Sequence, residues 1–379
     1  MPTSAGESSE RIDVLDGLRG VAVIAVIGFH YFSRWTLPLN TTNLYPYGAA
    51  LASFPLFRFG YLGVHLFFLV SGFVISLTLT RCETSREFFI RRFARLFPAM
   101  VLAASATFVI VQVLPPHFFS LKARDFLPSL TFTDPYVYKL LLGFDCEFID
   151  GAYWSLFVEV RFYVWAALVY FCASRSMFLR NSALLMNASM AVLLLEIMAV
   201  RAPGLGIADL LLFPEFAPWL FSGVAFFFIW KDRLNVTAWV MVIEGLTVNV
   251  SRSLSVVGGV EWMFVLGTYA LFVAFALHVN ALRFLGTHWL TRVGAASYTL
   301  YLLHQKIGVT TIASVAASLG VTGRISLLIA LFVAGGLAVA SIAIYDLYEV
   351  PTRRYITRWG RQVLGIQGRS VQRQSGVTP

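Results

Sequence analysis

The stretch RIDVLDGLRGVAVIAVIGFHYF, residues 11–32, is apolar enough from Val21 onward to enter a membrane. It nevertheless carries Arg19 at the start of the apolar run and His30 well inside it. Ionisable side chains in hydrocarbon cost several kcal/mol unless they are paired or hydrated. The stretch therefore predicts a membrane-spanning helix that contributes to a buried polar site.

Composition extends this prediction to the whole chain. Of the 379 residues, 58% are hydrophobic and 13% are charged, whereas soluble domains average about 25% charged residues. A span needs about 20 mostly apolar residues. We predict an all-α, polytopic transmembrane helix bundle with about ten spans, at residues 14–35, 58–80, 97–114, 152–172, 182–200, 212–230, 236–250, 259–281, 294–315 and 325–347.

The distribution of basic residues predicts the orientation. The segment RCETSREFFIRRFAR after the second span carries five arginines, and six more follow the last span. Because basic loops stay inside the cell, both termini are expected in the cytoplasm, with the protein in the inner (cytoplasmic) membrane. The net charge of +9 needs no nucleic acid as partner, since anionic lipids attract basic segments.

The ends of the chain differ from its middle. Residues 1–10 are polar and lack the features of a signal peptide. We expect a disordered cytoplasmic N-terminus at 1–10, a membrane domain at 11–355 and a basic cytoplasmic tail at 356–379. The three scattered cysteines give no disulfide framework and no zinc spacing, so no metal site is expected.

Arg19 and His30 are eleven residues apart, which places both side chains on one helix face, separated by about 16 Å along the axis. Asp16 lies three residues before Arg19 and can pair with it. Taken alone, the two residues have an equally good explanation without a functional site. Arg19 would be one of the basic residues that set the orientation in the membrane, and His30 would be a buried histidine whose hydrogen bonds are satisfied.

Three further predicted spans carry polar residues at similar depth. These residues are His65 in span two, Glu159 in span four and His304 in span nine. The glycines around His65 are better explained by close helix packing. An internal pair of Glu159 with Arg161 is a weak alternative, because residues two apart do not face each other on a helix. One buried polar cavity in the middle and outer half of the bilayer explains these residues together.

Arg92 and Arg95 mark a second candidate site on the predicted cytoplasmic face. They are three residues apart, so on a helix they share a face and can hold phosphates. Topology alone also places arginines in this loop.

Together these stretches resemble the acyltransferase-3 family of integral-membrane acyltransferases, over residues 11–355. The first match is LDGLRG with Arg19 and His30, followed by GVHLFFLVSGF and the R-x-x-R pair of Arg92 and Arg95. The later matches are W-S-L-x-x-E at Trp154, Ser155, Leu156 and Glu159, S-Y-x-x-Y-x-x-H at Ser297, Tyr298, Tyr301 and His304, and E-x-P at Glu349 and Pro351. One position departs: relatives often carry an acidic residue where this chain has His65, so a catalytic role there is in doubt.

The resemblance implies an O-acyltransferase that moves an acyl group, for which we expect acetyl, from cytoplasmic acyl-CoA to a hydroxyl. The acceptor is expected to be a glycan, a lipid-linked saccharide or a small hydroxylated compound. No permanently bound cofactor is expected, and the bilayer is the other partner. Some relatives carry an extra hydrolase-like domain, which this chain lacks, so the membrane domain is expected to act alone or with a partner protein.

The resemblance also implies roles for single residues. His30 is expected to act as the base, Glu159 to orient it and Arg19 to face the donor, while Arg92 and Arg95 bind the phosphates of acyl-CoA. The other candidates are Asp16, His65, Ser71, Trp154, Ser155, Tyr298, His304 and Glu349. A transporter or flippase of an envelope glycan precursor, without chemistry, is the alternative, although no inverted repeat is found.

Overall fold

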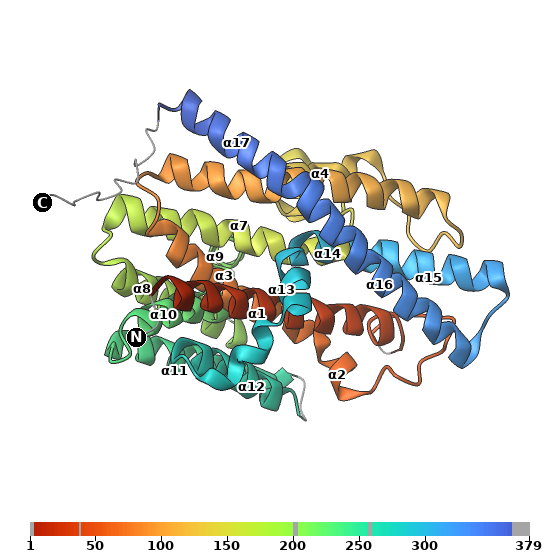
Figure 1. Cartoon of the computed structure of the whole chain (residues 1–379), viewed down its shortest axis with the longest axis horizontal. Coiled ribbons are helices and arrows are strands. Elements are labelled where there is room, and N and C mark those ends of the chain that lie inside the picture. The colour runs from red at the N-terminus through yellow and green to blue at the C-terminus, as the bar shows by residue number, and fades with distance from the viewer. Residues whose placement is uncertain (1–3, 38, 200–203, 257–259, 366–379) are drawn as a thin grey trace, which may run out of the picture.

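The computed structural model describes residues 4–37, 39–199, 204–256 and 260–365. Within these ranges the chain forms helices and no strand, and most helices run along the longest axis of the molecule (Figure 1). The predicted all-α bundle is therefore confirmed for the part of the chain that is described.

The α-helices of the first half are α1 (Ser4–Phe32), α2 (Pro55–Arg58), α3 (Gly63–Leu79), α4 (Ser85–Val113), α5 (Phe126–Thr131), α6 (Pro135–Leu142), α7 (Trp154–Ala167), α8 (Phe178–Ile197) and α9 (Leu205–Leu212). Those of the second half are α10 (Ala217–Lys231), α11 (Val236–Val256), α12 (Glu261–Ala276), α13 (His288–Ala295), α14 (Ser297–Leu303), α15 (Gln305–Leu319), α16 (Ser326–Ile344) and α17 (Val350–Val363). The short 3₁₀ segments are η1 (Gly60–Leu62), η2 (Ala123–Asp125), η3 (Gly151–Tyr153), η5 (Asn280–Gly286) and η6 (Gly323–Ile325), and two π-helical segments are η4 (Leu168–Ala173) and η7 (Tyr345–Glu349).

Among the described residues, seven helical segments are long and apolar enough to cross a membrane, or eight if the bent pair α12 and η5 counts as one span. The predicted number of ten is therefore not confirmed. The two remaining predicted segments, 236–250 and 294–315, fall on α11 and on α14 with α15. The helix assigned from Ser4 overlaps residues 1–10, and the domain boundaries near residues 10 and 355 stay predictions.

Glycines bring the central helices into close contact, as the sequence predicted for the surface around His65. A Cβ atom on Gly60 or Gly63 would lie 2.2 or 2.4 Å from a carbonyl oxygen of α1. A Cβ atom on Gly72 would lie 2.0 Å from the carbonyl oxygen of Leu220 in α10. Helix α3 is therefore held between α1 and α10 by backbone contacts that no larger residue permits.

We expect Gly72→Ala to lower the free energy of unfolding by about 1–3 kcal/mol, because the added methyl group overpacks a backbone contact. Gly335 in α16 is the matched control, since a Cβ atom there meets nothing within 4 Å. Reversible denaturation of both variants in detergent measures the difference. Equal stability of the two variants would contradict the close contact between α3 and α10.

Two further features position the site. Helix α17 lies beside α4 (Figure 1), and a Cβ atom on Gly360 would lie 2.9 Å from the Ile90 side chain. The loop between α4 and α7 packs on the bundle through its aromatic rings: Phe148 stacks on Phe157 with centroids 4.9 Å apart, and Phe119 contacts Trp35 at 5.3 Å. These contacts hold α17 against α4 and the loop against the bundle.

Candidate active site

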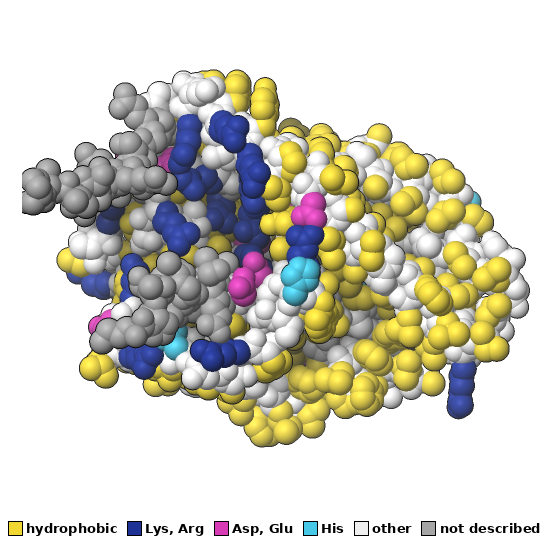
Figure 2. All heavy atoms as spheres, viewed as in Figure 1, with side chains coloured by type: hydrophobic (Ala, Val, Ile, Leu, Met, Phe, Trp, Pro, Cys, Tyr) yellow, Lys and Arg dark blue, Asp and Glu magenta, His cyan; other side chains and the backbone are white. Residues whose placement is uncertain are grey.

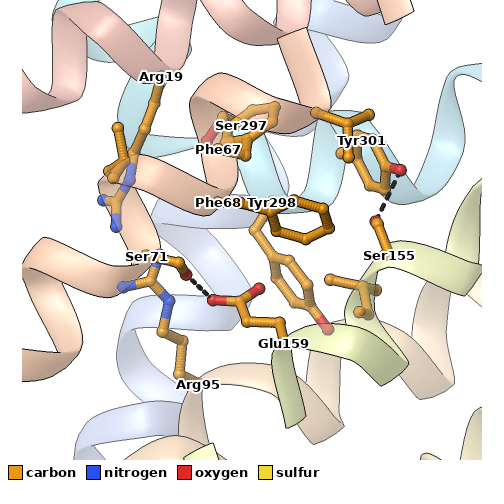
Figure 3. A pocket seen from close by; sticks show the side chains of 13 residues that line it. Arg19, Phe67, Phe68, Ser71, Arg95, Ser155, Glu159, Ser297, Tyr298 and Tyr301 are labelled. Carbon is orange, nitrogen blue, oxygen red and sulfur yellow. Dashed lines mark hydrogen bonds between the residues drawn. The ribbon is translucent and has the colours of Figure 1, made fainter. Parts of the chain in front are cut away.

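An interior cavity of about 60 Å³ lies between α1, α3, α4, α7 and α14 (Figure 3). Its polar lining residues are Arg19, Ser71, Arg95, Ser155, Glu159, Ser297, Tyr298 and Tyr301. Residues from four of the predicted spans meet in this cavity, but of the polar residues on which the sequence prediction rested only Arg19 and Glu159 line it, whereas His30, His65 and His304 do not.

The carboxylate of Glu159 bridges α3 and α7. It accepts hydrogen bonds from the hydroxyls of Ser71 and Tyr163. Arg161 points elsewhere, because it donates to the backbone carbonyls of Phe157 and Leu210. The internal pair of Glu159 with Arg161 is therefore not formed, and Glu159 faces the cavity (Figure 3).

Two guanidinium groups stand on one side of this cavity. Arg19 forms the predicted ion pair with Asp16 at 3.0 Å, and its side chain is 14% exposed. The guanidinium of Arg95, from α4, points toward that of Arg19 (Figure 3). Because Glu159 lies beside them, the cavity carries two positive charges and one nearby carboxylate, an arrangement that suits an anionic or strongly polarised ligand.

A second, basic pocket of about 380 Å³ lies between α4 and α17. Its lining consists of two threonines and eight arginines: Arg81, Arg91, Arg92, Arg95, Arg353, Arg354, Arg358 and Arg361. Figure 2 shows Lys and Arg side chains gathered at this end of the molecule, whereas the surface farther along the bundle is mainly hydrophobic. Such a pocket binds a ligand with several negative charges.

The sequence near the start of α4 builds this pocket. Thr84 caps the helix by accepting from the backbone N–H of Glu87. The Glu87 carboxylate then accepts from Arg91 at 2.8 Å and from Arg361 of α17. Glu87 thereby ties the two arginine-bearing helices together.

Arg92 is held rigidly in this pocket. Its side chain donates to Thr78 and lies over the rings of Tyr163 and Phe88 at 5.5 and 5.7 Å. The residue is 8% exposed, and among the described residues its Nε atom has no hydrogen-bond partner. A planar guanidinium fixed in this way can hold a phosphate with little loss of conformational entropy.

Arg95 lines both the interior cavity and the basic pocket. The sequence analysis predicted the buried polar cavity and the phosphate-binding arginines as two separate sites. In the structure the two sites share the side chain of Arg95.

His30 lies beyond the far end of the cavity from the arginines. Tyr301, which lines the cavity, has its ring 5.4 Å from that of His304, and the rings of His304 and His30 are 4.8 Å apart. Nδ1 of His30 lies 3.0 Å from the Val26 carbonyl oxygen and 3.1 Å from Nε2 of His304. The imidazole neighbour of His30 is thus His304, whereas Glu159 is engaged by Ser71 and Tyr163.

Comparison with known protein families gives a match over most of the chain. Residues 12–346 match the profile of the acyltransferase-3 family, described as an acyltransferase domain. The chain belongs to this family. Its R-x-x-R pair lies in the basic pocket, and the other motifs contribute to the cavity or to the histidine pair, except E-x-P, whose Glu349 bonds to Thr299 of α14.

Similar curated proteins carry acetyltransferase names. O-acetyltransferase OatA of Staphylococcus aureus is 25% identical over 330 residues, covering 77% of this chain and 50% of that protein. Peptidoglycan O-acetyltransferase OatA of Listeria monocytogenes is 26% identical over 174 residues, covering 43% of this chain and 25% of that protein. The putative peptidoglycan O-acetyltransferase YrhL of Bacillus subtilis is 27% identical over 161 residues, covering 40% of this chain and 22% of that protein. The chain thus spans half or less of the length of these relatives, and no solved structure matches it.

The remaining family-motif candidates have separate surroundings. Ser155 and Tyr298 line the cavity; the Ser155 hydroxyl lies 2.8 Å from that of Tyr301, and Tyr298 donates to the Leu96 carbonyl at 2.9 Å. His65 packs against Trp219 with centroids 4.9 Å apart and does not itself line the cavity, although its ring lies 6.3 Å from that of the lining residue Phe68.

Two more candidates lie among buried neighbours. Trp154 contacts Phe216 and Phe68 through its ring, at 4.8 and 6.2 Å. Glu349 is buried at the end of η7 and accepts a hydrogen bond from Thr299 of α14. Neither lines the cavity, so both are placed to hold α7 and α14 around it.

The arginines of α17 are the part of the site that the sequence analysis missed, because it assigned residues 356–379 to a basic tail. The spacing of Arg354, Arg358 and Arg361, by four and then three residues, places them on one helix face. That spacing was the sequence feature that could have indicated a binding surface on this helix.

Proposed function

We propose that this chain is an integral-membrane O-acyltransferase that moves an acetyl group from acyl-CoA to a hydroxyl of a glycan or of another hydroxylated acceptor. Membership of the family supports acyl transfer. The names of the relatives support acetyl as the acyl group and a glycan, peptidoglycan in two of the three, as the acceptor class.

The observation that carries the proposal is that Arg95 belongs to both the basic pocket and the interior cavity. Acyl-CoA has a phosphorylated head and a long thin arm that ends in the thioester. A head bound among the arginines of α4 and α17 would direct the arm past Arg95 into the cavity. The thioester would then approach Tyr301 and the histidine pair.

Within this scheme His30 is the general base and the arginines stabilise charge. An alcohol is a poor nucleophile until its proton is removed, and a histidine is suited to that step at neutral pH. Arg19 and Arg95 would stabilise negative charge that develops on the donor side. Asp16 pairs with Arg19 and Glu159 lies beside both cations, and the bonds of Glu159 to Ser71 and Tyr163 hold the wall of the cavity.

The alternative of a flippase without chemistry would need a passage for a saccharide. Membership of the acyltransferase-3 family favours acyl transfer over this alternative.

The proposed orientation places the basic pocket in the cytoplasm, where acyl-CoA is made. Helices α1 and α17 support it, because α1 begins and α17 ends toward the end of the bundle (Figure 1) where Lys and Arg side chains gather (Figure 2). Reporter fusions after α17 and within the loop 115–151 are expected to report opposite sides of the membrane. The same side for both fusions would rule this topology out.

The donor site is tested by binding and transfer of labelled acetyl-CoA in proteoliposomes. We expect the double variant Arg354→Ala with Arg358→Ala to weaken donor binding by about 10–100-fold, because each loses a charge-assisted contact to phosphate. Both side chains line the basic pocket, whereas the exposed Arg86 of α4 does not.

Arg86→Ala is the matched control and should bind the donor as the unchanged protein does. Equal donor affinity in all three proteins would remove α17 from the donor site. Absence of acetyl transfer by the unchanged protein with every hydroxylated acceptor offered would reject the proposed function.

A further inference from the structure

The imidazole of His304 is fixed in place opposite His30. His304 is fully buried, at the break between α14 and α15. Its carbonyl oxygen accepts a hydrogen bond from the Tyr31 hydroxyl at 3.0 Å, and Tyr31 follows His30 directly in α1. The backbone and the ring of His304 therefore both contact α1, which leaves the two imidazoles little freedom to separate.

The neighbouring carbonyl groups determine which nitrogen atoms carry protons. Nδ1 of His304 lies 2.6 Å from the Tyr301 carbonyl oxygen, which can only accept, so Nδ1 is the donor. A fully buried imidazole is neutral unless a counter-charge pairs with it. It then has one N–H, and Nε2 of His304 is an acceptor.

The same reasoning fixes the tautomer of His30. Its Nδ1 atom lies 3.0 Å from the Val26 carbonyl oxygen and 3.1 Å from Nε2 of His304. Both neighbours are acceptors, so Nδ1 of His30 carries the proton. Its Nε2 atom keeps the lone pair, and among the described residues nothing donates to it.

We propose that His304 is a positioning residue, which holds His30 in the Nδ1–H tautomer and so presents Nε2 to the acceptor hydroxyl. This inference rests on the proposed acyl transfer. The acceptor oxygen bonds to the thioester carbonyl carbon while its proton passes to Nε2 of His30. The carbon–sulfur bond then breaks, and the same proton passes to the leaving thiolate, which gives the ester and the free thiol of CoA.

The contact has a second consequence during the reaction. While His30 carries the extra proton, its Nδ1–H donates to Nε2 of His304 as a charge-assisted hydrogen bond. A neutral acceptor does this without placing a carboxylate beside the imidazole inside the membrane, where a charge is expensive. His304 thus takes the orienting part that an aspartate has in a serine-protease triad.

Two substitutions separate positioning from packing. His304→Phe keeps a planar ring and removes the acceptor, whereas His304→Gln keeps an acceptor oxygen near the position of Nε2. We expect His304→Phe to lower kcat by about 10–100-fold, the scale of loss seen when the hydrogen-bond partner that orients a metal-ligating histidine is removed. His304→Gln should recover most of kcat, and the KM for acetyl-CoA should stay unchanged in both.

A double-mutant cycle of His304→Phe with His30→Ala tests whether the loss of kcat in His304→Phe arises through His30. In that background His304→Phe should cause no further loss, since groups that act as a unit are not additive. An equal loss in both His304 variants, or a His304→Phe loss that persists without His30, would reduce His304 to a packing residue and overturn the proposal. So would an unchanged kcat in His304→Phe.

The tautomer itself gives a readout that does not depend on turnover. ¹⁵N NMR of histidine-labelled protein in bilayers should show His30 protonated at Nδ1 in the unchanged protein and in His304→Gln, and a tautomer mixture in His304→Phe. A His30 protonated at Nε2 would overturn the inference even if acetyl transfer is observed. Failure of the unchanged protein to transfer acetyl would instead reject the proposed function, and the role of His304 in it would fall too.

Discussion

Replacing His30 with alanine is expected to lower acetyl transfer by about 10²–10⁴-fold, the usual contribution of a general base. The acceptor hydroxyl would then keep its proton while it attacks the thioester, which raises the barrier of the chemical step. Donor binding should survive, because the basic pocket between α4 and α17 lies at the other end of the cavity from the histidine pair. The measurement is transfer of labelled acetyl from acetyl-CoA in proteoliposomes, with donor affinity measured on the same preparation.

His117 provides the matched control for this experiment. It is exposed in the segment between α4 and α5, so His117→Ala should transfer acetyl at the normal rate. Near-normal turnover in a folded His30→Ala protein would remove His30 from the chemistry. His304 would then be the next candidate for the base, because its Nε2 atom loses its partner His30 in that variant while its Nδ1 atom stays bonded to the Tyr301 carbonyl.

The parts of the site that lie within one helix were predictable from the sequence. Arg19 and Asp16 are one turn apart, and their ion pair at 3.0 Å follows from helix geometry alone. Arg92 and Arg95 share a helix face for the same reason, and both line the basic pocket. Local periodicity fixes such pairs because the backbone of one helix determines which side chains are neighbours.

For contacts between helices, the sequence predicted only that polar residues of several spans would lie near one another, not which of them would pair. Similar depth in four spans predicted one cavity, but depth does not determine which side chain meets which. The sequence analysis therefore paired His30 with Glu159, whereas the structure brings His304 to His30 and gives Glu159 to Ser71 and Tyr163. The rotation of each helix about its axis decides between these pairings, and that rotation is set by close packing such as the glycine contacts of α3.

The arginines of α17 were missed for a different reason. A basic segment after a last apolar span satisfies the rule for orientation whether or not it binds anything. The tertiary contact that turns it into a pocket wall, Glu87 bonded to Arg361, joins residues 274 positions apart. Only the shared face of Arg354, Arg358 and Arg361 distinguishes this helix from an ordinary topological tail.

Arg95→Ala is expected to impair both binding and chemistry, because this side chain alone among the arginines of α4 and α17 lines the interior cavity as well as the basic pocket. Loss of a charge-assisted phosphate contact should raise the KM for acetyl-CoA by about 10–100-fold. Loss of positive charge beside the reacting thioester should lower kcat by about 10²–10³-fold. Steady-state kinetics in proteoliposomes, with donor and acceptor varied separately, resolves the two effects.

The comparison with α17 makes this result diagnostic. Arg354→Ala with Arg358→Ala should raise KM and leave kcat nearly unchanged, because these side chains line only the basic pocket. Arg95→Lys should fall between Arg95→Ala and the unchanged protein, since lysine keeps the charge and loses the planar fork. If Arg95→Ala changes KM alone, Arg95 is a phosphate ligand like its neighbours and the thioester does not pass through the cavity. A loss in kcat that the α17 variant does not share would instead link the two sites through Arg95, because it would separate the effect of Arg95 from that of phosphate binding in the basic pocket.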